Sequence, residues 1–324
     1  MILALVEHDR GKLNPLSLEM LTFARRLAEP LGGPLEAVLV DPGAGPLAYG
    51  LAAYGVSVVH LAAHTQLTDY GPEGWAQTVV ELMGALQPAL VLAGGSERGN
   101  EVMAHVAARA GLPLAANCLE AQPGDSLVVT RLRWGGSLLE EARLGGATRL
   151  LTVAPHALVA EPTANPSEIT IRPFTPNLSA RDLRLQVTGR VEALPGKVSL
   201  AEAPVVVGGG RGVGSAEGFK LLEELAGLLG GTVGCSRAVT SLGWRPHLDQ
   251  VGQTGTRIAP EIYIACGISG AIQHMVGCKA AKHILAINID PDAPIVQHAD
   301  YAIIGDLKEV VPAISAALRQ AGPA

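Results

Sequence analysis

The chain has 324 residues, of which 48% are hydrophobic and 17% charged, and its formal net charge is -6. This length predicts two domains rather than one compact core, and the apolar content supports buried sheets and argues against a disordered chain. Aromatic residues make up only 3%, so neither a cationic face nor the stacking platforms of a nucleic-acid-binding protein are expected.

The N-terminal apolar run is short, covering residues 2–6 before Glu7 and Asp9. It has no basic leader or small-residue cleavage site, so it predicts a strand rather than a signal or transit peptide. No stretch approaches the roughly 20 apolar residues of a membrane span. We therefore expect a cytoplasmic protein that is not embedded in a membrane, with its four scattered cysteines as small core residues.

Apolar runs alternate with amphipathic stretches through the first 110 residues. Strands are predicted at residues 2–6, 36–40, 56–61 and 89–93, and helices from residue 17 onward, at 75–86 and at 100–110. Such alternation predicts a parallel sheet with helices on both faces.

The pattern changes after residue 126. Two glycine pairs punctuate short apolar runs between residues 126 and 155, which predicts antiparallel hairpins added to the first sheet. Residues 162–195 hold several prolines, one strand-like run at 169–173 and a mixed-charge stretch. We place the domain boundary there, near Glu192, which gives domains at residues 1–192 and 193–324.

The second domain repeats the strand-helix alternation. Strands are predicted at residues 203–207, 262–266, 283–289 and 301–304, and helices at 216–229, after Gly270 and after Asp306. This is a second doubly wound, Rossmann-like α/β domain. Ligands of such sheets lie beyond the carboxyl ends of the strands, so the loops that follow the strands are the candidate site.

The first of these loops, residues 208–215, has the sequence GGGRGVGS. Glycines let backbone amides approach a phosphate, and Arg211 offers a guanidinium for pyrophosphate. The loop does not fit GxGxxG, so a tight turn with a solvated arginine is the alternative. The second loop offers the Ser236 hydroxyl and the Arg237 cation, or else an ordinary surface pair.

The third and fourth loops add amides, a hydroxyl and a histidine. A glycine-bounded turn that suits the polar edge of a heterocycle, or is simply a β-turn, comprises Val251, Gly252, Gln253 and Thr254. Ser269 is predicted as the N-cap of the next helix, whose free amides begin at Gly270 and favour negative charge. His274, near the first turn, would donate a hydrogen bond to a reduced ring, the alternative being a structural histidine.

Two further polar residues follow the last strands. Asn288 and Asp306 suit the ribose and adenine edges of a nucleotide, although both are also ordinary cap and turn residues. Five loops of one domain together supply amides, two arginines, hydroxyls and a histidine. An extended dinucleotide explains them more economically than five unrelated turns.

A long segment carries a family resemblance. Residues 260–314, PEIYIACGISGAIQHMVGCKAAKHILAINIDPDAPIVQHADYAIIGDLKEVVPAI, resemble the C-terminal signature of electron transfer flavoprotein α subunits. The blocks VVVGGGRGVGSAEGF, GCSRAV and QVGQTG precede it in the family's order, and the first half resembles the family more loosely. The resemblance implies FAD as cofactor and these contacts: Arg211, Ser236, Arg237, Val251, Gly252, Gln253, Thr254, Ser269, Gly270, Ala271, Ile272, Gln273, His274, Asn288, Asp306 and Leu307.

The resemblance also implies roles at the flavin ring. Arg237 would lie against the isoalloxazine, Gln253 and Thr254 near its carbonyl and N5 edge, and His274 near its pyrimidine edge. Arg237, His274 and the helix amides after Ser269 would then stabilise negative charge on the reduced ring and raise its first reduction potential.

The remaining contacts belong to the other end of the cofactor. Ser269 and Arg211 would serve the phosphate and ribityl region, and the adenosine end would meet Asn288, Asp306 and Leu307. Gly214 stands where the family more commonly has a lysine, which affects the expected affinity for phosphate.

Partners follow from the same resemblance. A separately encoded β subunit would pack against the first domain and hold AMP. Electrons would come from flavoprotein dehydrogenases, such as the acyl-CoA dehydrogenases of fatty acid β-oxidation, and pass to a quinone-linked oxidoreductase. The protein would then be an electron carrier and not an enzyme with its own substrate. The GGSERG loop, residues 94–99, is expected to be structural because no cofactor is assigned to the first half.

Two other functions were weighed against this one. An NAD(P)-dependent oxidoreductase would need a ribose-binding acid about 20 residues after the glycine loop, and Glu223 and Glu224 come too early and lie within the predicted helix. A nucleotide-binding module or assembly scaffold without redox chemistry would leave Arg237 and His274 without a role.

Overall fold

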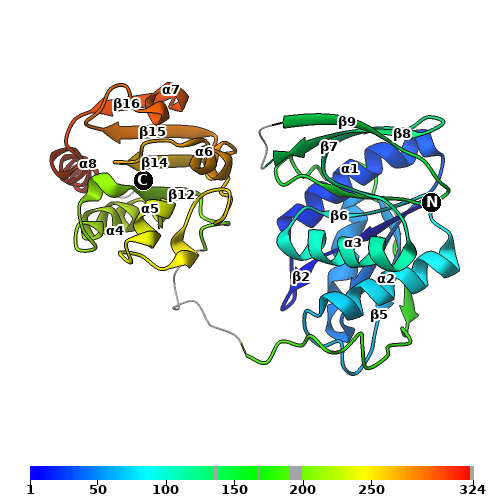
Figure 1. Ribbon diagram of the computed structural model, residues 1–324. Coiled ribbons are helices and arrows are strands. Elements are labelled where there is room, and N and C mark those ends of the chain that lie inside the picture. Colours follow the sequence, from blue (N-terminus) through cyan, green and yellow to red (C-terminus); the bar gives the residue numbers. More distant parts are fainter. Residues whose placement is uncertain (135–137, 167, 190–198, 322–324) are drawn as a thin grey trace. The chain divides into compact units, whose positions relative to one another are not determined.

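The computed structural model describes residues 1–134, 138–166, 168–189 and 199–321 (Figure 1). The chain divides into two compact units, residues 1–190 and 191–324, and each unit is described by itself. The predicted domain boundary, near Glu192, lies outside the described residues.

The first unit is built on a nine-stranded sheet in the order β11-β5-β4-β1-β6-β10-β7-β8-β9. Its strands from β11 to β7 run parallel, and β8 and β9 are antiparallel additions at one edge. The prediction of a parallel sheet with an antiparallel extension is confirmed. The bounds are β1 (Ile2–Leu5), β4 (Leu35–Val40), β5 (Val56–Ala62), β6 (Leu90–Gly94), β7 (Leu114–Gln122), β8 (Leu127–Arg133), β9 (Leu138–Leu144), β10 (Arg149–Val153) and β11 (Thr170–Phe174).

One strand of this sheet differs from the sequence prediction. Residues 126–155 were expected to form antiparallel hairpins only, but β10 inserts between β6 and β7 and runs parallel to both. The physical reason is its composition, since the run from Leu150 to Val153 is buried on both faces of the sheet. A continuous apolar run of this kind suits a central parallel strand rather than a hairpin with one wet face.

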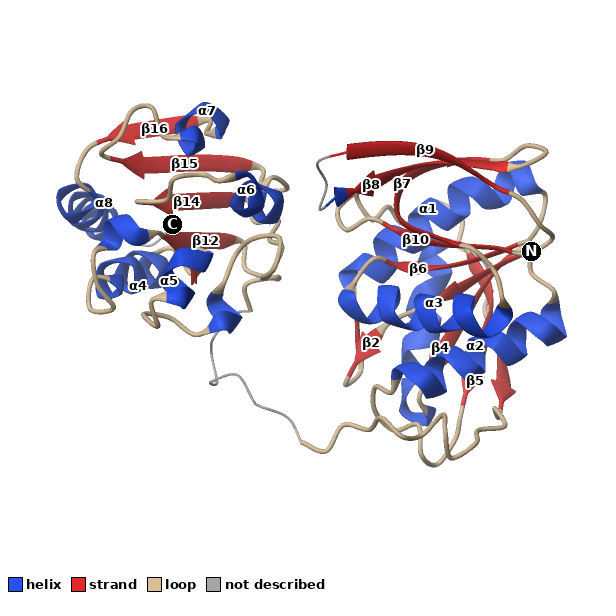
Figure 2. Ribbon diagram, in the orientation of Figure 1, coloured by secondary structure: helices blue, strands red, loops and turns tan. Residues whose placement is uncertain are grey.

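Helices cover both faces of the first sheet (Figure 2). One face packs against α1 (Pro15–Leu31) and the 3-10 helix η1 (Pro42–Tyr54), and the other against α2 (Pro72–Leu86) and α3 (Glu97–Ala110). A two-stranded ribbon precedes α1, formed by β2 (His8–Asp9) and β3 (Lys12–Leu13). Helix α1 begins where the Asn14 side chain accepts from the amide of Leu16 at 3.0 Å and ends at Gly32, whose φ is 63°.

The glycine-containing loop at residues 94–99 is accounted for by its own packing. Ser96 is the N-cap of α3, where its Oγ accepts from the Gly99 amide at 2.8 Å, and its hydroxyl donates to Glu7. A Cβ at Gly99 would come within 3.1 Å of that Oγ. The local geometry therefore explains the loop as a helix cap, as the structural interpretation of its sequence predicts.

The second unit contains a five-stranded parallel sheet in the order β13-β12-β14-β15-β16. Its strands are β12 (Val205–Gly209), β13 (Thr232–Cys235), β14 (Ile262–Cys266), β15 (His283–Asn288) and β16 (Tyr301–Ile304). One face is covered by α4 (Phe219–Leu228), α5 (Arg237–Ser241) and α8 (Leu307–Ala321), and the other by α6 (Ile272–Cys278) and α7 (Pro294–His298). Two short 3-10 helices complete the unit, η3 (Arg211–Val213) and η4 (His247–Asp249). The doubly wound fold is confirmed.

The strand order locates a switch point. From β12 the chain first adds β13 on one side and then crosses to add β14 on the other. The loops after β12 and β14 consequently diverge, and a crevice forms between them at the carboxyl ends of the strands.

Two helices of this unit differ from the prediction. The helix expected at 216–229 begins only at Phe219, because the Ser215 hydroxyl accepts from the Gly218 amide at 3.2 Å and holds a turn there. The proline-bearing loop after β15 contains α7, which starts at Pro294, a residue well suited to the first helical turn.

No helix within the described ranges is long and apolar enough to cross a membrane. All four cysteines are buried and free, as expected of core residues. Burial raises the pKa of each thiol to about 12, which makes them poor nucleophiles at neutral pH: Cys118, Cys235, Cys266 and Cys278.

Candidate functional site

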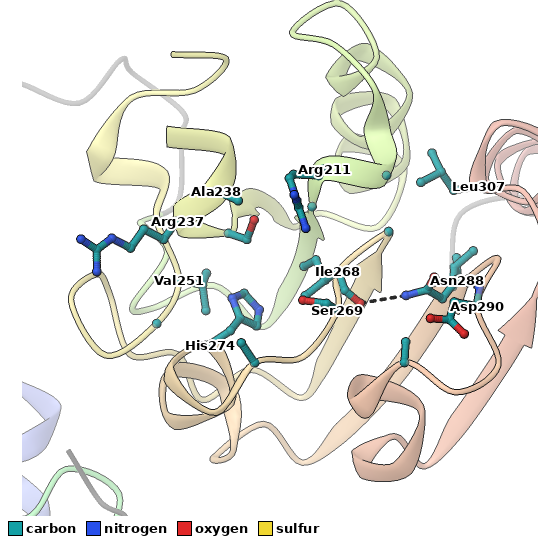
Figure 3. A pocket seen from close by; sticks show the side chains of 18 of the residues that line it. Arg211, Arg237, Ala238, Val251, Ile268, Ser269, His274, Asn288, Asp290 and Leu307 are labelled. Carbon is teal, nitrogen blue, oxygen red and sulfur yellow. Dashed lines mark hydrogen bonds between the residues drawn. The ribbon is translucent and has the colours of Figure 1, made fainter. Parts of the chain in front are cut away.

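A cavity of about 800 Å³ lies at the carboxyl ends of the strands of the second unit (Figure 3). Its wall is made by the loops after β12, β13, β14, β15 and β16, together with residues 250–254. Cofactor and drug-sized ligands occupy sites of roughly 300–1,000 Å³. The cavity is therefore large enough for an extended ligand and lies at the switch point of the sheet.

Nearly all the residues singled out in the sequence line this cavity. They are Arg211, Ser236, Arg237, Val251, Gly252, Gln253, Thr254, Ser269, Ala271, Gln273, His274, Asn288, Asp306 and Leu307. Gly270 and Ile272 are not part of the wall. A Cβ at Gly270 would lie 2.6 Å from the Cα of Ile295, so this residue packs against α7, and the Ile272 side chain is 70% exposed.

The glycine-rich loop after β12 serves a different purpose from the one predicted. The amide of Gly210 donates to the Cys266 carbonyl at 2.9 Å, and the amide of Gly212 donates to the Gly267 carbonyl at 3.1 Å. The amide of Gly214 is likewise used within the loop, by Arg211. The expectation that these amides are free to cradle a phosphate is therefore wrong for these three residues. Their backbones are committed to the neighbouring loop and to their own turn.

The glycines are needed because two loops touch backbone to backbone. A Cβ on Gly210 would lie 2.7 Å from the carbonyl carbon of Gly267 and 2.8 Å from the Cα of Ile268. A Cβ on Gly212 would lie 2.7 Å from the Cα of Gly267. Real Cβ atoms do not come this close to backbone, so the two walls of the crevice meet only because no side chains stand between them.

Three cations line the cavity: Arg211, Arg237 and Lys308. Among the described residues, no ion pair or side-chain hydrogen bond involves their charged groups. Figure 3 shows Arg211 directed toward Ile268 and Ser269, inside the cavity, whereas Arg237 is exposed and extends away from His274. Arg237 must therefore rotate about its side-chain bonds to contact a ligand beside His274.

Sequence reasoning missed Lys308. It follows directly after Asp306 and Leu307, and its amide donates to the Asp306 carboxylate at 2.9 Å at the start of α8. Its Nζ lies 3.7 Å from the place where a Cβ on Gly214 would stand. Lys308 thus brings a positive charge close to Gly214, and only the folded chain shows this proximity.

Gln250 was also missed. It is 1% exposed, accepts from the Thr240 hydroxyl at 2.9 Å and donates to the Thr254 hydroxyl at 3.0 Å. Beside it, the Val251 amide donates to the Cys235 carbonyl at 2.8 Å. Gln250 therefore joins the second loop to the third. Because the Thr254 oxygen accepts from Gln250, its own proton remains available for another acceptor.

The third loop also packs against α6. The Gln253 amide donates to the Gln273 carbonyl at 2.7 Å. A Cβ on Gly277 would lie 2.9 Å from the carbonyl carbon of Gly252 and closer still to its amide nitrogen and Cα. Helix α6 and the 251–254 loop therefore form one packed block on this side of the cavity.

Ser269 does not cap α6. The helix begins at Ile272, with Ala271 in the N-cap position, and the Ser269 carbonyl instead accepts from the Ile295 amide at 3.0 Å. Gly270 explains the difference because its φ of 81° is a left-handed turn that no α-helical residue adopts. The helix can start only after it, so the predicted cap is wrong, although Ser269 still lines the cavity.

His274 is the most buried titratable group of the wall, at 7% exposure. Its Nε2 lies 2.8 Å from the Tyr263 hydroxyl, and its Nδ1 is buried without a hydrogen-bond partner among the described residues. Burial lowers the pKa of His274 to about 4, an effect that the backbone of Val251 partly opposes. The ring is therefore neutral at pH 7 and carries one proton to donate.

Asn288 and Asp306 have the structural roles that were considered as alternatives. The Asn288 amide donates to the Ile268 carbonyl at 2.9 Å, and its carbonyl oxygen accepts from the Asp290 amide at 3.1 Å. These bonds tie the loops after β14 and β15 together (Figure 3). One amide proton of Asn288 and one carboxylate oxygen of Asp306 form no hydrogen bond with the residues that the structure describes, so both can still meet a ligand.

The acids considered for an NAD(P) site are engaged elsewhere. Glu223 pairs with Arg245, and Glu224 accepts from Arg319 at 2.7 Å. Neither glutamate lines the cavity. The ribose-binding acid that a dinucleotide-dependent dehydrogenase would need is therefore not supplied by these two residues.

Comparison with known families covers both units. A family model described as the electron transfer flavoprotein domain matches residues 2–176. A second, described as the electron transfer flavoprotein FAD-binding domain, matches residues 199–279. The second match includes the loops after β12, β13 and β14 that line the cavity.

Curated relatives align over nearly the whole chain. The electron transfer flavoprotein subunit alpha of Thermoanaerobacterium thermosaccharolyticum is 35% identical over 311 residues, covering 95% of this chain and 94% of the relative. The subunit of the same name from Mycobacterium tuberculosis is 39% identical over 98% of both chains. Protein FixB of Bradyrhizobium diazoefficiens is 38% identical, covering 97% of this chain and 87% of the relative.

Proposed function

The chain belongs to the electron transfer flavoprotein α-subunit family, and from that premise we propose that it holds one FAD in the 800 Å³ cavity of its second unit. Members of this family carry electrons and do not convert a substrate of their own. One observation carries the proposal. The segment that matches the FAD-binding family model contains most of the wall of a cavity at the switch point of a doubly wound sheet.

The chemistry of the wall fits FAD. The cofactor combines two phosphates with a flat heteroaromatic ring. The wall combines apolar residues and a buried imidazole with three cations that pair with no carboxylate in the part of the chain that the structure describes. Arg211 belongs to the loop after β12, and Lys308 reaches the same loop from the start of α8, so two elements supply cations for a pyrophosphate. Hydrogen bonds from these two cations would therefore bind the phosphates, because the glycine amides of the loop are already used within the protein.

Bound FAD supplies a ring that accepts and releases electrons. The residues of the chain set how readily it does so. Arg237, once rotated inward, places a fixed positive charge beside the ring, and the Thr254 hydroxyl has a proton to donate to it. His274 contributes a neutral donor whose own ring is buried, and electrostatic effects are stronger at a buried group than in open solvent. These groups favour the reduced ring when it carries negative charge.

We assign the adenosine end to the loops after β15 and β16. Leu307 is 4% exposed and offers an apolar surface, and Asn288 and Asp306 offer one remaining donor and one remaining acceptor. Ser269 is exposed beside the cavity and is assigned to the phosphate and ribityl region with Arg211.

We further propose the partners that complete electron transfer. The relatives are named as alpha subunits, which supports a heterodimer with a β subunit that holds AMP and packs on the first unit. The donors are flavoprotein dehydrogenases, such as the acyl-CoA dehydrogenases of fatty acid β-oxidation. The acceptor is a quinone-linked oxidoreductase.

The test is coexpression of the full chain with a β subunit of this family, followed by an absorption spectrum of the purified pair. Flavin bands that survive gel filtration are expected, with one FAD per pair after reconstitution. Reduction of these bands by an acyl-CoA dehydrogenase and its substrate tests the donor separately.

A colourless pair after incubation with FAD would overturn the proposal of a flavin site. If flavin binds but no flavoprotein dehydrogenase reduces it, the proposal of a flavin site stands and the assignment of donors is overturned.

A further inference from the structure

Tyr263 contacts His274 but does not itself line the cavity. Building on the proposed FAD site, we propose that Tyr263 is a positioning residue. It fixes the proton of His274 on Nδ1 and so determines which ring nitrogen donates to the ligand in the cavity.

The contact between the two side chains is close and dry. Tyr263 is the second residue of β14 and has no exposed surface, and its hydroxyl lies 2.8 Å from the Nε2 of His274. The two ring centres are 6.0 Å apart and the planes are tilted by 34°. Among the described residues, no other polar side chain is hydrogen-bonded to the Tyr263 hydroxyl.

The direction of the hydrogen bond follows from the protonation states. Burial raises the pKa of Tyr263 well above its ordinary value, so the phenol keeps its proton. That proton needs an acceptor, and Nε2 of His274 is the partner recorded for it among the described residues. Because burial also keeps the imidazole neutral, Nε2 accepts and the single ring proton belongs on Nδ1.

The Nδ1 proton is then a donor without a well-formed hydrogen bond among the described residues. A buried donor left unpaired costs about 1–3 kcal/mol, so native structures leave few of them. Among the described residues lining the cavity, His274 is the one whose side chain carries such an atom. The backbone of Val251 acts as a weak acceptor for the ring and so favours its proton, but its geometry does not satisfy Nδ1 as a full hydrogen bond would. An acceptor on the ligand, such as a ring carbonyl oxygen, would satisfy the donor.

Gly208, near the end of β12, makes room for this arrangement. Gly208 pairs with Ala265 across the β12–β14 ladder. A Cβ on Gly208 would lie 2.6 Å from Cε2 and 2.7 Å from Cζ of Tyr263, and closer still to its hydroxyl oxygen. The phenol thus occupies the space that a side chain at residue 208 would fill. The glycine at residue 208 is therefore explained by the packing of Tyr263 and does not require a phosphate.

The first test measures the tautomer directly. The full chain is labelled with ¹⁵N-histidine, and NMR spectra at pH 7 distinguish the protonated ring nitrogen of His274 from the bare one. The wild-type protein is expected to carry the proton on Nδ1, both without cofactor and with FAD. In Tyr263→Phe, which keeps the ring but loses the hydroxyl, a mixture of tautomers or a proton on Nε2 is expected.

A proton on Nε2 in the wild type would overturn the proposal, as would an unchanged tautomer in Tyr263→Phe. The wild-type measurement stands even if the variant does not fold. It is also made without cofactor, so it remains informative if the protein proves not to bind FAD, and the two proposals can fail separately.

The second test asks whether Tyr263 acts through His274. Tyr263→Phe is expected to weaken FAD binding two- to tenfold, roughly the value of one hydrogen bond, and to shift the reduction potential of the bound flavin. The same change made in a His274→Gln background should have no further effect on either quantity. Equal effects in both backgrounds would show that Tyr263 acts only on packing, and would overturn its positioning role.

Discussion

Replacing Gly210 with alanine tests whether the cavity depends on backbone contact between its two walls. The φ of Gly210 is -104°, which any residue adopts, so alanine adds no backbone strain. Its Cβ would lie 2.7 Å from the carbonyl carbon of Gly267 and 2.8 Å from the Cα of Ile268. Normal carbon contacts are at least 3.5 Å, so the loops after β12 and β14 must part by about 1 Å.

The cost follows from this overlap. Inserting a methyl group into a packed region typically costs about 1–3 kcal/mol. If the full cost falls on the conformation that binds the cofactor, FAD affinity drops by roughly 5- to 150-fold. Affinity is measured by titrating FAD into the purified protein and following flavin fluorescence, and stability is measured by urea denaturation of the same samples.

Gly227→Ala is the matched control. Gly227 lies within α4, and a Cβ there would meet no atom within 4 Å. Alanine should stabilise this helix by about 0.5–1 kcal/mol and leave FAD affinity unchanged. Wild-type affinity in Gly210→Ala would refute the reasoning, because it would mean that the two loops separate without deforming the site.

Three further predictions concern the charged and titrating groups of the wall. Arg237→Ala should lower the first reduction potential of the bound flavin in a redox titration, whereas Arg237→Lys should retain most of the effect; an unchanged potential in Arg237→Ala would remove this cation from the mechanism. Lys308→Met should weaken FAD binding about two- to fivefold at low salt and less at high salt. The control is Lys220→Met, on the exposed face of α4 and outside the cavity wall, which should leave FAD binding unchanged. Equal losses of affinity in both variants would indicate a general charge effect. Burial holds the pKa of His274 at about 4, whereas the unfolded ring titrates near about 6.5, so the unfolded chain takes up this proton first as the pH falls. The contribution of the neutral His274 ring to the free energy of unfolding is therefore complete above about pH 6.5. It is lost as the pH falls to 4, by on the order of 3 kcal/mol. His274→Gln should show a smaller decrease in the free energy of unfolding by urea over the same pH interval.

The alternation of apolar runs was sufficient to predict both sheets and the doubly wound fold. It failed at β10, where the segment was grouped with the hairpins around it. Residues 150–153 read equally well as a hairpin strand or a central one, because a short apolar run specifies burial and not its neighbours. The pairing with β6 comes from a contact between residues about 60 positions apart, which local patterns do not encode.

The sequence indicated which residues lie around the cavity better than it indicated the contacts that they make. Glycines at 210 and 212 suggested amides for a phosphate, but in the folded chain those amides bond to the loop after β14. A run of glycines indicates that the backbone approaches another group closely, but it does not show whether that group is a ligand or a neighbouring loop. Whether the sixteen predicted residues contact FAD stays a prediction.

Gln250, Lys308 and Tyr263 escaped notice for a common reason. Each is an ordinary residue type whose importance depends on a partner elsewhere in the chain, at Thr254, Gly214 and His274 respectively. Tyr263 in particular sits inside a buried strand, where an aromatic residue looks like core. The role of its hydroxyl becomes visible only through the contact with His274.

The loop at residues 251–254 is pinned before any ligand arrives. Hydrogen bonds from Val251 to Cys235, from Gln253 to Gln273 and between Thr254 and Gln250 already restrict its torsion angles. Ordering a flexible segment on association consumes conformational entropy, on the order of 1–2 kcal/mol per residue. In this protein that entropy is given up during folding. A cofactor entering the cavity therefore meets a preorganised wall, and its affinity is not diminished by having to assemble it.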